Sequence, residues 1–447
     1  MKFALVLEIL QHARATIITN KIIQCAFILS LKINIALVIY CVYRSHEYHR
    51  SRTPILTKSN TIFLYIAIII TFFVWGAVAV ISGPLMPETT EAFSINGTQS
   101  GLIFIIWSTG FTIGSFSAKP LLSKFKFERL LGFVACGSAL FAFCLYLSDS
   151  YLQYLLSFLL LGVTGGASFT TAHTFVGQTF IHNRAAALSA LDVVFSMGSM
   201  VSPLLLVFLF SFAFAWQTPF LLAAFTFLLC AIAYLSIRRK SEEGDQSHSE
   251  DASQAQLPSK ILLPIAVLAV PTFFMGALEW AHNLWFVSFA IDRGVEEDTA
   301  RIYHSVFLAG MIAIRIITIV IGNRIHNIKL IRVLLAFTLI GNIGIVMADS
   351  WSLLIVSSFI MGVGLGPMFP ILLARAMDVN PERSASFSVA MVLFITAGGH
   401  LASLAIGALA DIYSIANTFM FSTVFAILLV ISFEYFCTRT GKILKNP

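Results

Sequence analysis

The chain has 447 residues, of which 58% are hydrophobic and only 11% charged, and its mean hydropathy is +0.88. A soluble globular domain carries roughly 25% charged residues, so the composition excludes a water-soluble protein. The net charge of +6 would suit nucleic acid, but the basic residues are distributed as in a membrane protein, and no nucleic-acid partner is expected.

The first 58 residues are the hardest part of the chain to interpret. Residues 21–43 are apolar but are interrupted by Lys32 and Asn34. Three interpretations remain open: an extra membrane helix, a helix on the membrane surface, or an extension upstream of the true start. A cleaved signal peptide fits poorly, because the apolar run starts late and no small-residue cleavage site follows it.

Apolar windows long enough to cross a bilayer follow in two series of six. A spanning helix needs about 20 apolar residues, and barrel strands are excluded because they would alternate in polarity. The sequence therefore predicts an all-α membrane protein with 12 transmembrane helices. The windows lie near 60–82, 100–122, 130–148, 152–177, 187–211 and 217–237, and then near 261–290, 303–322, 330–348, 351–375, 386–409 and 414–436.

The two series divide the chain into two domains. Residues 59–237 are expected to form an N-terminal six-helix bundle, and residues 261–437 a C-terminal one. Between them, residues 238–260 are rich in Ser, Gln and charge and have no apolar periodicity, which predicts a flexible cytoplasmic linker. Residues 438–447 form a cytoplasmic tail.

The two halves are similar to each other at an offset of 200 residues. Residues 161–169 resemble residues 361–369, and five of the thirteen glycines between positions 76 and 198 recur at plus 200. A duplicated apolar chain with small residues at matching depths is typical of a transporter built from two repeats. The recurring glycines pair as Gly76 with Gly276, Gly110 with Gly310, Gly162 with Gly362, Gly166 with Gly366 and Gly198 with Gly398.

Basic residues gather in the loops at one end of the predicted helices. Seventeen lie in these loops, in the linker and in the tail, whereas the opposite loops carry only Arg293 and Arg301. The positive-inside rule places the basic loops and the C-terminus in the cytoplasm. A multi-pass protein of the plasma membrane is expected, which is the inner membrane if the source is bacterial.

This arrangement resembles the major facilitator superfamily. The loop at 322–329 is similar to a degraded form of that family's Gly-x-x-x-Asp-Arg signature. Residues 73–87, 276–285 and 364–370 resemble the fucose-permease and TsgA-like branch. The resemblance implies a secondary active transporter of a small polar solute, first of all a sugar, that works by alternating access and couples to protons.

Two positions depart from fucose permease. Gly83 stands where that protein has an Asp in the first helix, and residues 169–173 lack the Glu of its fourth helix. Both carboxylates are linked to proton coupling and sugar binding in the family. Their absence argues against fucose itself and against proton coupling through the first half.

Charged residues inside the apolar windows are the candidate site. A charge at the bilayer centre costs about 2.5–3.5 kcal/mol even on the mildest scale, so it usually faces a cavity or a partner. Asp192, Glu279 and Arg315 are such residues. Because helical spacings of three and four stack side chains, Glu279, His282 and Asn283 are expected to form one polar stripe along the central cavity.

Each candidate has a predicted role. Glu279 binds substrate or carries a proton with Arg315 as a moving partner; the alternative is a structural ion pair between the two. Trp285 is expected to stack on the substrate. The remaining candidates are two gating residues and two single histidines that are either packing groups or substrate contacts: Asp192 and Arg324, and His173 and His400.

Other classes of function find little support in the sequence. There is no phosphate-binding Gly-x-x-x-x-Gly-Lys loop, the six cysteines have no metal spacing, and no catalytic pairing lies near a membrane face. We therefore expect no enzyme activity, no cofactor and no metal, and a monomer whose partners are the substrate, protons and lipid. A transporter-like sensor without transport and an exporter of amphipathic compounds remain alternatives.

Overall fold

A computed structural model describes residues 58–179, 184–237, 259–321, 328–379 and 384–443. The N-terminal segment to residue 57 and nearly all of the linker lie outside these ranges, so the predictions for them stay predictions. Within the described ranges the chain is helical, with short turns and no strand.

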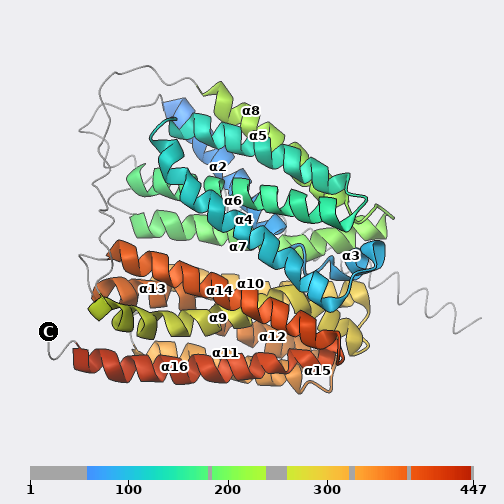
Figure 1. Cartoon of the computed structure of the whole chain (residues 1–447), viewed down its shortest axis with the longest axis vertical. Helices are drawn as coiled ribbons and strands as arrows, with labels where there is room; N and C mark the ends of the chain where they lie inside the picture. The colour runs from blue at the N-terminus through green and yellow to red at the C-terminus, as the bar shows by residue number, and fades with distance from the viewer. Residues whose placement is uncertain (1–57, 180–183, 238–258, 322–327, 380–383, 444–447) are drawn as a thin grey trace, which may run out of the picture.

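The N-terminal bundle is built from six long helices and one short one (Figure 1). The short helix α3 follows the first long helix and lies at one end of the bundle. Pro87 near its start and Glu88 in its first turn are favourable there, because proline needs no donor at that position and a carboxylate suits the helix dipole. The helices are α2 (Lys58–Val80), α3 (Met86–Phe93), α4 (Gly97–Leu122), α5 (Phe127–Tyr146), α6 (Tyr151–Thr179), α7 (Arg184–Ser211) and α8 (Thr218–Ser236).

The C-terminal bundle repeats this plan and lies beside the first (Figure 1). Two of its spans are divided into two helices, one of them at Pro367, which has no N–H with which to continue the helix. The helices are α9 (Ser259–Asp292), α10 (Glu297–Ile321), α11 (Ile328–Val346), α12 (Trp351–Leu365), α13 (Met368–Val379), α14 (Ser384–Ala410), α15 (Ile415–Phe419) and α16 (Phe421–Ile443).

Twelve helical spans follow from these elements. Eleven are long and apolar enough to cross a membrane, and the 34-residue α9 is the twelfth. The predicted all-α membrane fold is thus confirmed. In Figure 1, α3 and α15 lie at one end of the molecule and the C-terminus at the other. We call the first end the α3 end.

The recurring glycines lie where helices cross in close contact. A Cβ added to Gly76 or Gly198, on α2 and α7, would lie 1.8 Å from a carbonyl oxygen of the other helix. The equivalent crossing in the second half is between α9 and α14. There, a Cβ added to Gly276 or Gly398 would lie 2.0 or 1.9 Å from a carbonyl oxygen of the other helix. The sequence repeat is therefore a repeat of helix crossings that only a residue without a side chain permits.

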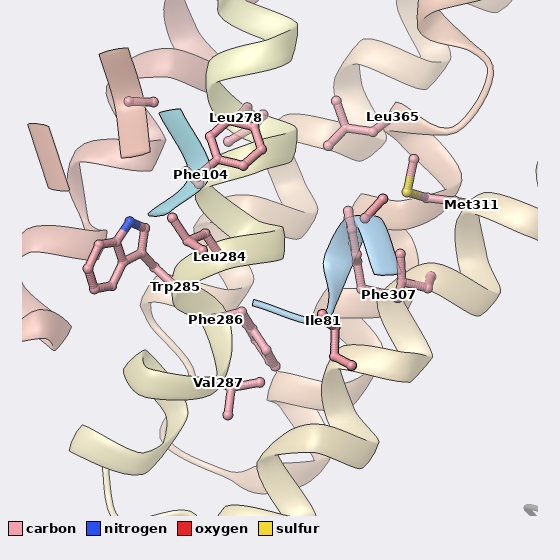
Figure 2. Packing of buried hydrophobic residues seen from close by; sticks show 14 of the residues in the cluster. Ile81, Phe104, Leu278, Leu284, Trp285, Phe286, Val287, Phe307, Met311 and Leu365 are labelled. Atoms are coloured by element: carbon pink, nitrogen blue, oxygen red, sulfur yellow. The ribbon is translucent and has the colours of Figure 1, made fainter. Parts of the chain in front are cut away.

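Buried side chains join the two bundles near the α3 end. Figure 2 shows Ile81 and Phe104 of the N-terminal half beside residues of α9 and α10. The largest buried apolar cluster includes these residues together with Leu278, Phe286 and Phe307. This packing places the central part of α9 at the seam between the bundles.

Candidate functional site

Arg315 connects the two bundles at the seam. Its Nε donates to the carbonyl oxygen of Gly366 at 2.9 Å, and one of its terminal nitrogens donates to Oγ of Ser196 on α7. Its charge acts on the carboxylate of Glu279, but the described residues include no ion pair between the two. The structural ion pair that the sequence left open is therefore not formed here.

Glu279 is half-buried on α9, and no described group donates a hydrogen bond to it. A carboxylate next to a positive charge, yet without a direct partner, has acceptor capacity left for another molecule. Among the predicted site residues, Glu279 is the carboxylate that the structure places at the seam in this way.

His282 and Asn283 lie differently from the predicted stripe. His282 is fully buried, its ring centroid is 4.0 Å from that of Phe307, and neither of its ring nitrogens has a partner among the described residues. The amide oxygen of Asn283 is 3.2 Å from Nε2 of His304. Both side chains thus contact α10 inside the C-terminal bundle, because α10 packs against this side of α9. Direct substrate contact has no support for either residue in this conformation.

The aromatic residue at the seam is Trp280 rather than Trp285. Trp285 is 1% exposed, and its Nε1 donates to the carbonyl oxygen of Ser403 at 3.1 Å. Figure 2 shows its indole pointing away from Phe307 and Met311. Trp280 is half-buried, and its ring centroid lies 4.3 Å from that of Phe104 in the other bundle.

The two single histidines both have specific polar partners. His400 on α14 forms a hydrogen bond across the seam with Oγ of Ser108 on α4. His173 on α6 lies 3.4 Å from Asp192 on α7, within the N-terminal bundle. Asp192 is therefore paired with a histidine in the same bundle. Arg324, the other predicted gating residue, lies outside the described residues.

A buried ionic cluster at the α3 end was not predicted from the sequence. Arg301 is 1% exposed and donates to Glu88 on α3, to Glu297 at 2.6 Å and to Asp298 at 2.8 Å. It also donates to the carbonyl oxygen of Pro84 at 3.1 Å. Asp298 and Glu297 precede Arg301 by three and four residues, a helical spacing that can be recognised in the sequence. The contact with Glu88 spans 213 residues, so no local sequence pattern predicts it.

A second contact between the bundles lies at the same end. The carboxylate of Asp411, just after α14, accepts from the backbone N–H of Gly97 at 2.6 Å and of Thr98 at 3.0 Å. It also accepts from Oγ1 of Thr98 at 2.6 Å. A carboxylate at a helix N-terminus satisfies free N–H groups and suits the helix dipole. Together with the Arg301 cluster, it joins the two bundles at the α3 end.

The fold and the sequence agree on the family. The family model described as Major Facilitator Superfamily matches residues 64–392 and 268–446. The chain belongs to this superfamily. Two similar curated proteins are the glucose/mannose transporter GlcP of Bacillus subtilis (strain 168) and the glucose/galactose transporter of Brucella abortus biovar 1 (strain 9-941). Each is 25% identical to this chain; the alignments cover 83% and 82% of it, and 94% and 92% of the relatives.

Solved structures of low sequence identity share the fold. A bacterial homologue of the lysosomal transporter Spinster, inward-facing and unoccupied, has a TM-score of 0.69 at 12% identity and covers 87% of this chain and 98% of its own. The transporter FucP in the outward conformation has a TM-score of 0.57 at 15% identity, and it covers 83% of this chain and 98% of its own. These two structures show that a fold of this kind is found in both inward and outward states.

Proposed function

We propose that this protein is a secondary active transporter of a sugar-like solute and that Glu279 binds the solute between the bundles. The observation that carries the proposal is a half-buried carboxylate at the seam that accepts no hydrogen bond from any described residue. Sugar hydroxyls are donors that would satisfy it. Trp280 offers an apolar face beside it, and solute sites typically combine apolar walls with few polar groups. The two relatives named as hexose transporters support a hexose.

The orientation in the membrane is part of the proposal. The basic residues of the loops and tail support an orientation with the C-terminus in the cytoplasm and the α3 end outside. Because Arg301 and Asp411 join the bundles at the α3 end, we infer that the state described here receives solute from the cytoplasmic side. Transport then requires these contacts to open in the other half of the cycle.

Reconstituted vesicles test the proposal directly. Purified protein in proteoliposomes should show saturable uptake of D-glucose, D-galactose or D-mannose and none of L-glucose. Glu279→Gln should reduce uptake by at least about tenfold, since a lost charge-assisted hydrogen bond is worth about 1.5–3 kcal/mol. Glu434→Gln is the matched control, because Glu434 is an exposed carboxylate paired with Arg332 on the far side of the bundle. It should leave uptake unchanged.

The same preparation separates transport from sensing. Hexose binding, measured by a thermal shift, together with absence of uptake would favour the transporter-like sensor. Neither binding nor uptake of any hexose would overturn the proposed substrate class. Uptake that survives Glu279→Gln at the wild-type rate would overturn the role of Glu279.

A further inference from the structure

A cavity of about 440 Å³ lies at the α3 end, where the two bundles meet. Its wall in the N-terminal bundle comes from α3 and the start of α4, and its wall in the C-terminal bundle comes from the last turns of α9, the end of α14 and α15. Figure 1 shows α3 and α15 at this end of the molecule. Small-molecule sites typically have about 300–1,000 Å³, so the cavity is large enough for a small organic ligand.

The cavity is separate from the proposed solute site. Ser288, which lines it, follows Glu279 by nine residues on the continuous helix α9. At about 1.5 Å per residue, the two positions lie about 13 Å apart along the helix axis. Glu279 is not among the residues that line the cavity. The cavity therefore belongs to the α3 end of the seam and is distinct from the site at Glu279.

Two carboxylates line the cavity without a basic partner. Glu91 on α3 and Asp292 at the end of α9 are both exposed to solvent, and neither forms an ion pair with a described residue. Glu91 accepts no hydrogen bond on its carboxylate from the described residues, and Asp292 accepts one, from the backbone N–H of Ala416 at 2.9 Å. No Lys, Arg or His is among the described residues of the wall, so the cavity carries net negative charge.

A buried hydroxyl in the same cavity also lacks a partner. Ser288 is 8% exposed, and its Oγ forms no hydrogen bond with any described residue. A hydroxyl can both donate and accept a hydrogen bond, and its burial is unfavourable when it does neither. Because Ser288 lines the cavity, a polar group of a ligand bound there would satisfy it.

The rest of the wall is mostly apolar. Met86, Ile291 and Ile415 contribute aliphatic surface, and the buried Trp285 contributes an aromatic one. A metal ion has less support as the occupant, because no group of three His, Cys, Asp or Glu side chains among the described residues could hold one. A sugar has no positive charge to balance the two carboxylates. An organic cation with an apolar body matches the carboxylates, the apolar wall and the unpaired hydroxyl together.

We propose that this cavity binds a small organic cation with an apolar body, and that the bound cation holds the two bundles together at the α3 end. Its ammonium group lies between Glu91 and Asp292, one from each bundle, and its apolar body packs against Ile291 and Trp285. Because the wall comes from both bundles, the cavity is complete only while they are joined at this end. A ligand that binds one of two states shifts the equilibrium toward that state. The cation thus slows the transport cycle without being carried, an effect that rests on the proposed function, whereas its binding does not.

Tryptamine is the probe for binding, since it has an ammonium group, an aromatic body and an indole N–H that can donate to Ser288. Equilibrium dialysis of the purified protein with radiolabelled tryptamine should show saturable binding. Tryptophol, which has a hydroxyl group in place of the ammonium group, should compete at least about tenfold more weakly, because it lacks the charge-assisted hydrogen bonds. Equal competition by tryptophol would overturn the proposal, as would absence of saturable tryptamine binding.

Variants assign the probe to this cavity. Glu91→Gln and Asp292→Asn should each weaken tryptamine binding by about fivefold, as expected for exposed ion pairs, and Ser288→Ala by about fivefold through the lost hydrogen bond. Asp349→Asn is the matched control, because Asp349 is an exposed carboxylate in the turn after α11, at the same end but outside the cavity. It should bind as the wild type does. Unchanged binding in the Glu91→Gln/Asp292→Asn double variant would overturn the proposal.

Uptake into proteoliposomes tests the effect on the bundles. Tryptamine on both sides of the membrane should lower the maximal rate of hexose uptake, and excess hexose should not restore it, because the two ligands bind at different sites. The Glu91→Gln/Asp292→Asn double variant should transport hexose at the wild-type rate and resist tryptamine. Inhibition that excess hexose relieves, no inhibition at saturating tryptamine, or protein-dependent uptake of tryptamine itself would each overturn the proposal. Absence of hexose uptake in the wild type would overturn the proposed substrate and leave the binding experiment as the test of the cavity.

Discussion

At the scale of single residues, the glycine at each helix crossing sets how closely the helices approach. Gly198 is the clearest case, since a Cβ there would lie 1.8 Å from the backbone carbonyl oxygen of Phe73. Backbone cannot move aside as a side chain can, so Gly198→Ala must separate α7 from α2. Overpacking of this kind typically costs about 1–3 kcal/mol. We expect a fall in the thermal unfolding midpoint of the detergent-solubilised protein and a matching loss of folded yield.

The control for this prediction is Gly137→Ala on α5. A Cβ at Gly137 would meet Cγ2 of Thr164 at 3.0 Å and Cε2 of Phe141 at 3.8 Å, both of which are side-chain atoms. Its unfolding midpoint should change little or rise, because alanine favours a helix over glycine by about 1 kcal/mol. Equal losses at Gly198 and Gly137 would contradict the argument from backbone contact.

The sequence predicts the glycines better than the polar site, for a physical reason. A crossing glycine has a counterpart 200 residues away, so the repeat reveals it. Glu279, His282 and Asn283 lie within one turn, as their spacing predicts, but which of them faces the seam depends on where α10 packs. His304, which binds Asn283, comes from that other helix. Packing between helices that are separate in the chain cannot be predicted from the local spacing of residues.

At the scale of elements, α3 and α10 form a contact whose charge balance depends on pH. Three carboxylates surround Arg301, so the cluster carries more negative than positive charge. Burial raises the pKa of Glu88 to about 7, against the opposing effect of Arg301, and Glu297 adds to the rise. The apolar windows located the spanning helices but missed α3, which is too short and too polar to appear among them.

The raised pKa gives a signed prediction for the opening of the α3 end. With Glu88 in water its pKa returns toward 4.5, so between pH 4.5 and about 7 the closed state binds more protons than the open one. Acidification across this window therefore shifts the equilibrium between the open and closed states toward the closed one, by at most tenfold per pH unit. Above about pH 7 the carboxyl group is ionised in both states, so pH no longer changes this equilibrium. Glu88→Gln imitates the protonated form and should stay closed with no pH dependence over this range.

Thiol labelling measures this opening. Ser100 is 2% exposed at the closed seam and Ser150 is exposed at the same end of the bundle. In a background with the six native cysteines replaced, the labelling rate of Ser100→Cys relative to Ser150→Cys should rise from pH 5 to pH 8. Dividing by the rate at Ser150→Cys corrects for the rise of thiolate concentration with pH, which affects labelling at both positions. A ratio that is flat with Glu88 present, or equally steep in Glu88→Gln, would contradict the role of this carboxyl group.

At the scale of the whole molecule, the two halves share a frame but not their polar groups. The glycine crossings recur in both bundles, whereas Glu279 and Arg315 belong to the second and the His173–Asp192 pair to the first. The polar stripe predicted from the sequence, Glu279 with His282 and Asn283, lies in the second half. The structure adds a contact between His173 and Asp192 in the first, which appears only when α6 and α7 are packed together. Alternating access in such a molecule requires both ends of the seam to open in turn.

A cross-link at the α3 end tests whether that end must open. Thr98 and Asp411 touch through a hydrogen bond of 2.6 Å between the two bundles, so cysteines at both positions lie close enough to be joined by oxidation. We expect oxidised Thr98→Cys/Asp411→Cys protein to stop hexose uptake and a reductant to restore it. Each single variant, oxidised in the same way, should keep its rate, which separates the cross-link from the loss of the Asp411 cap on α4. Uptake that continues in the fully cross-linked protein would mean that the bundles do not part at this end during transport.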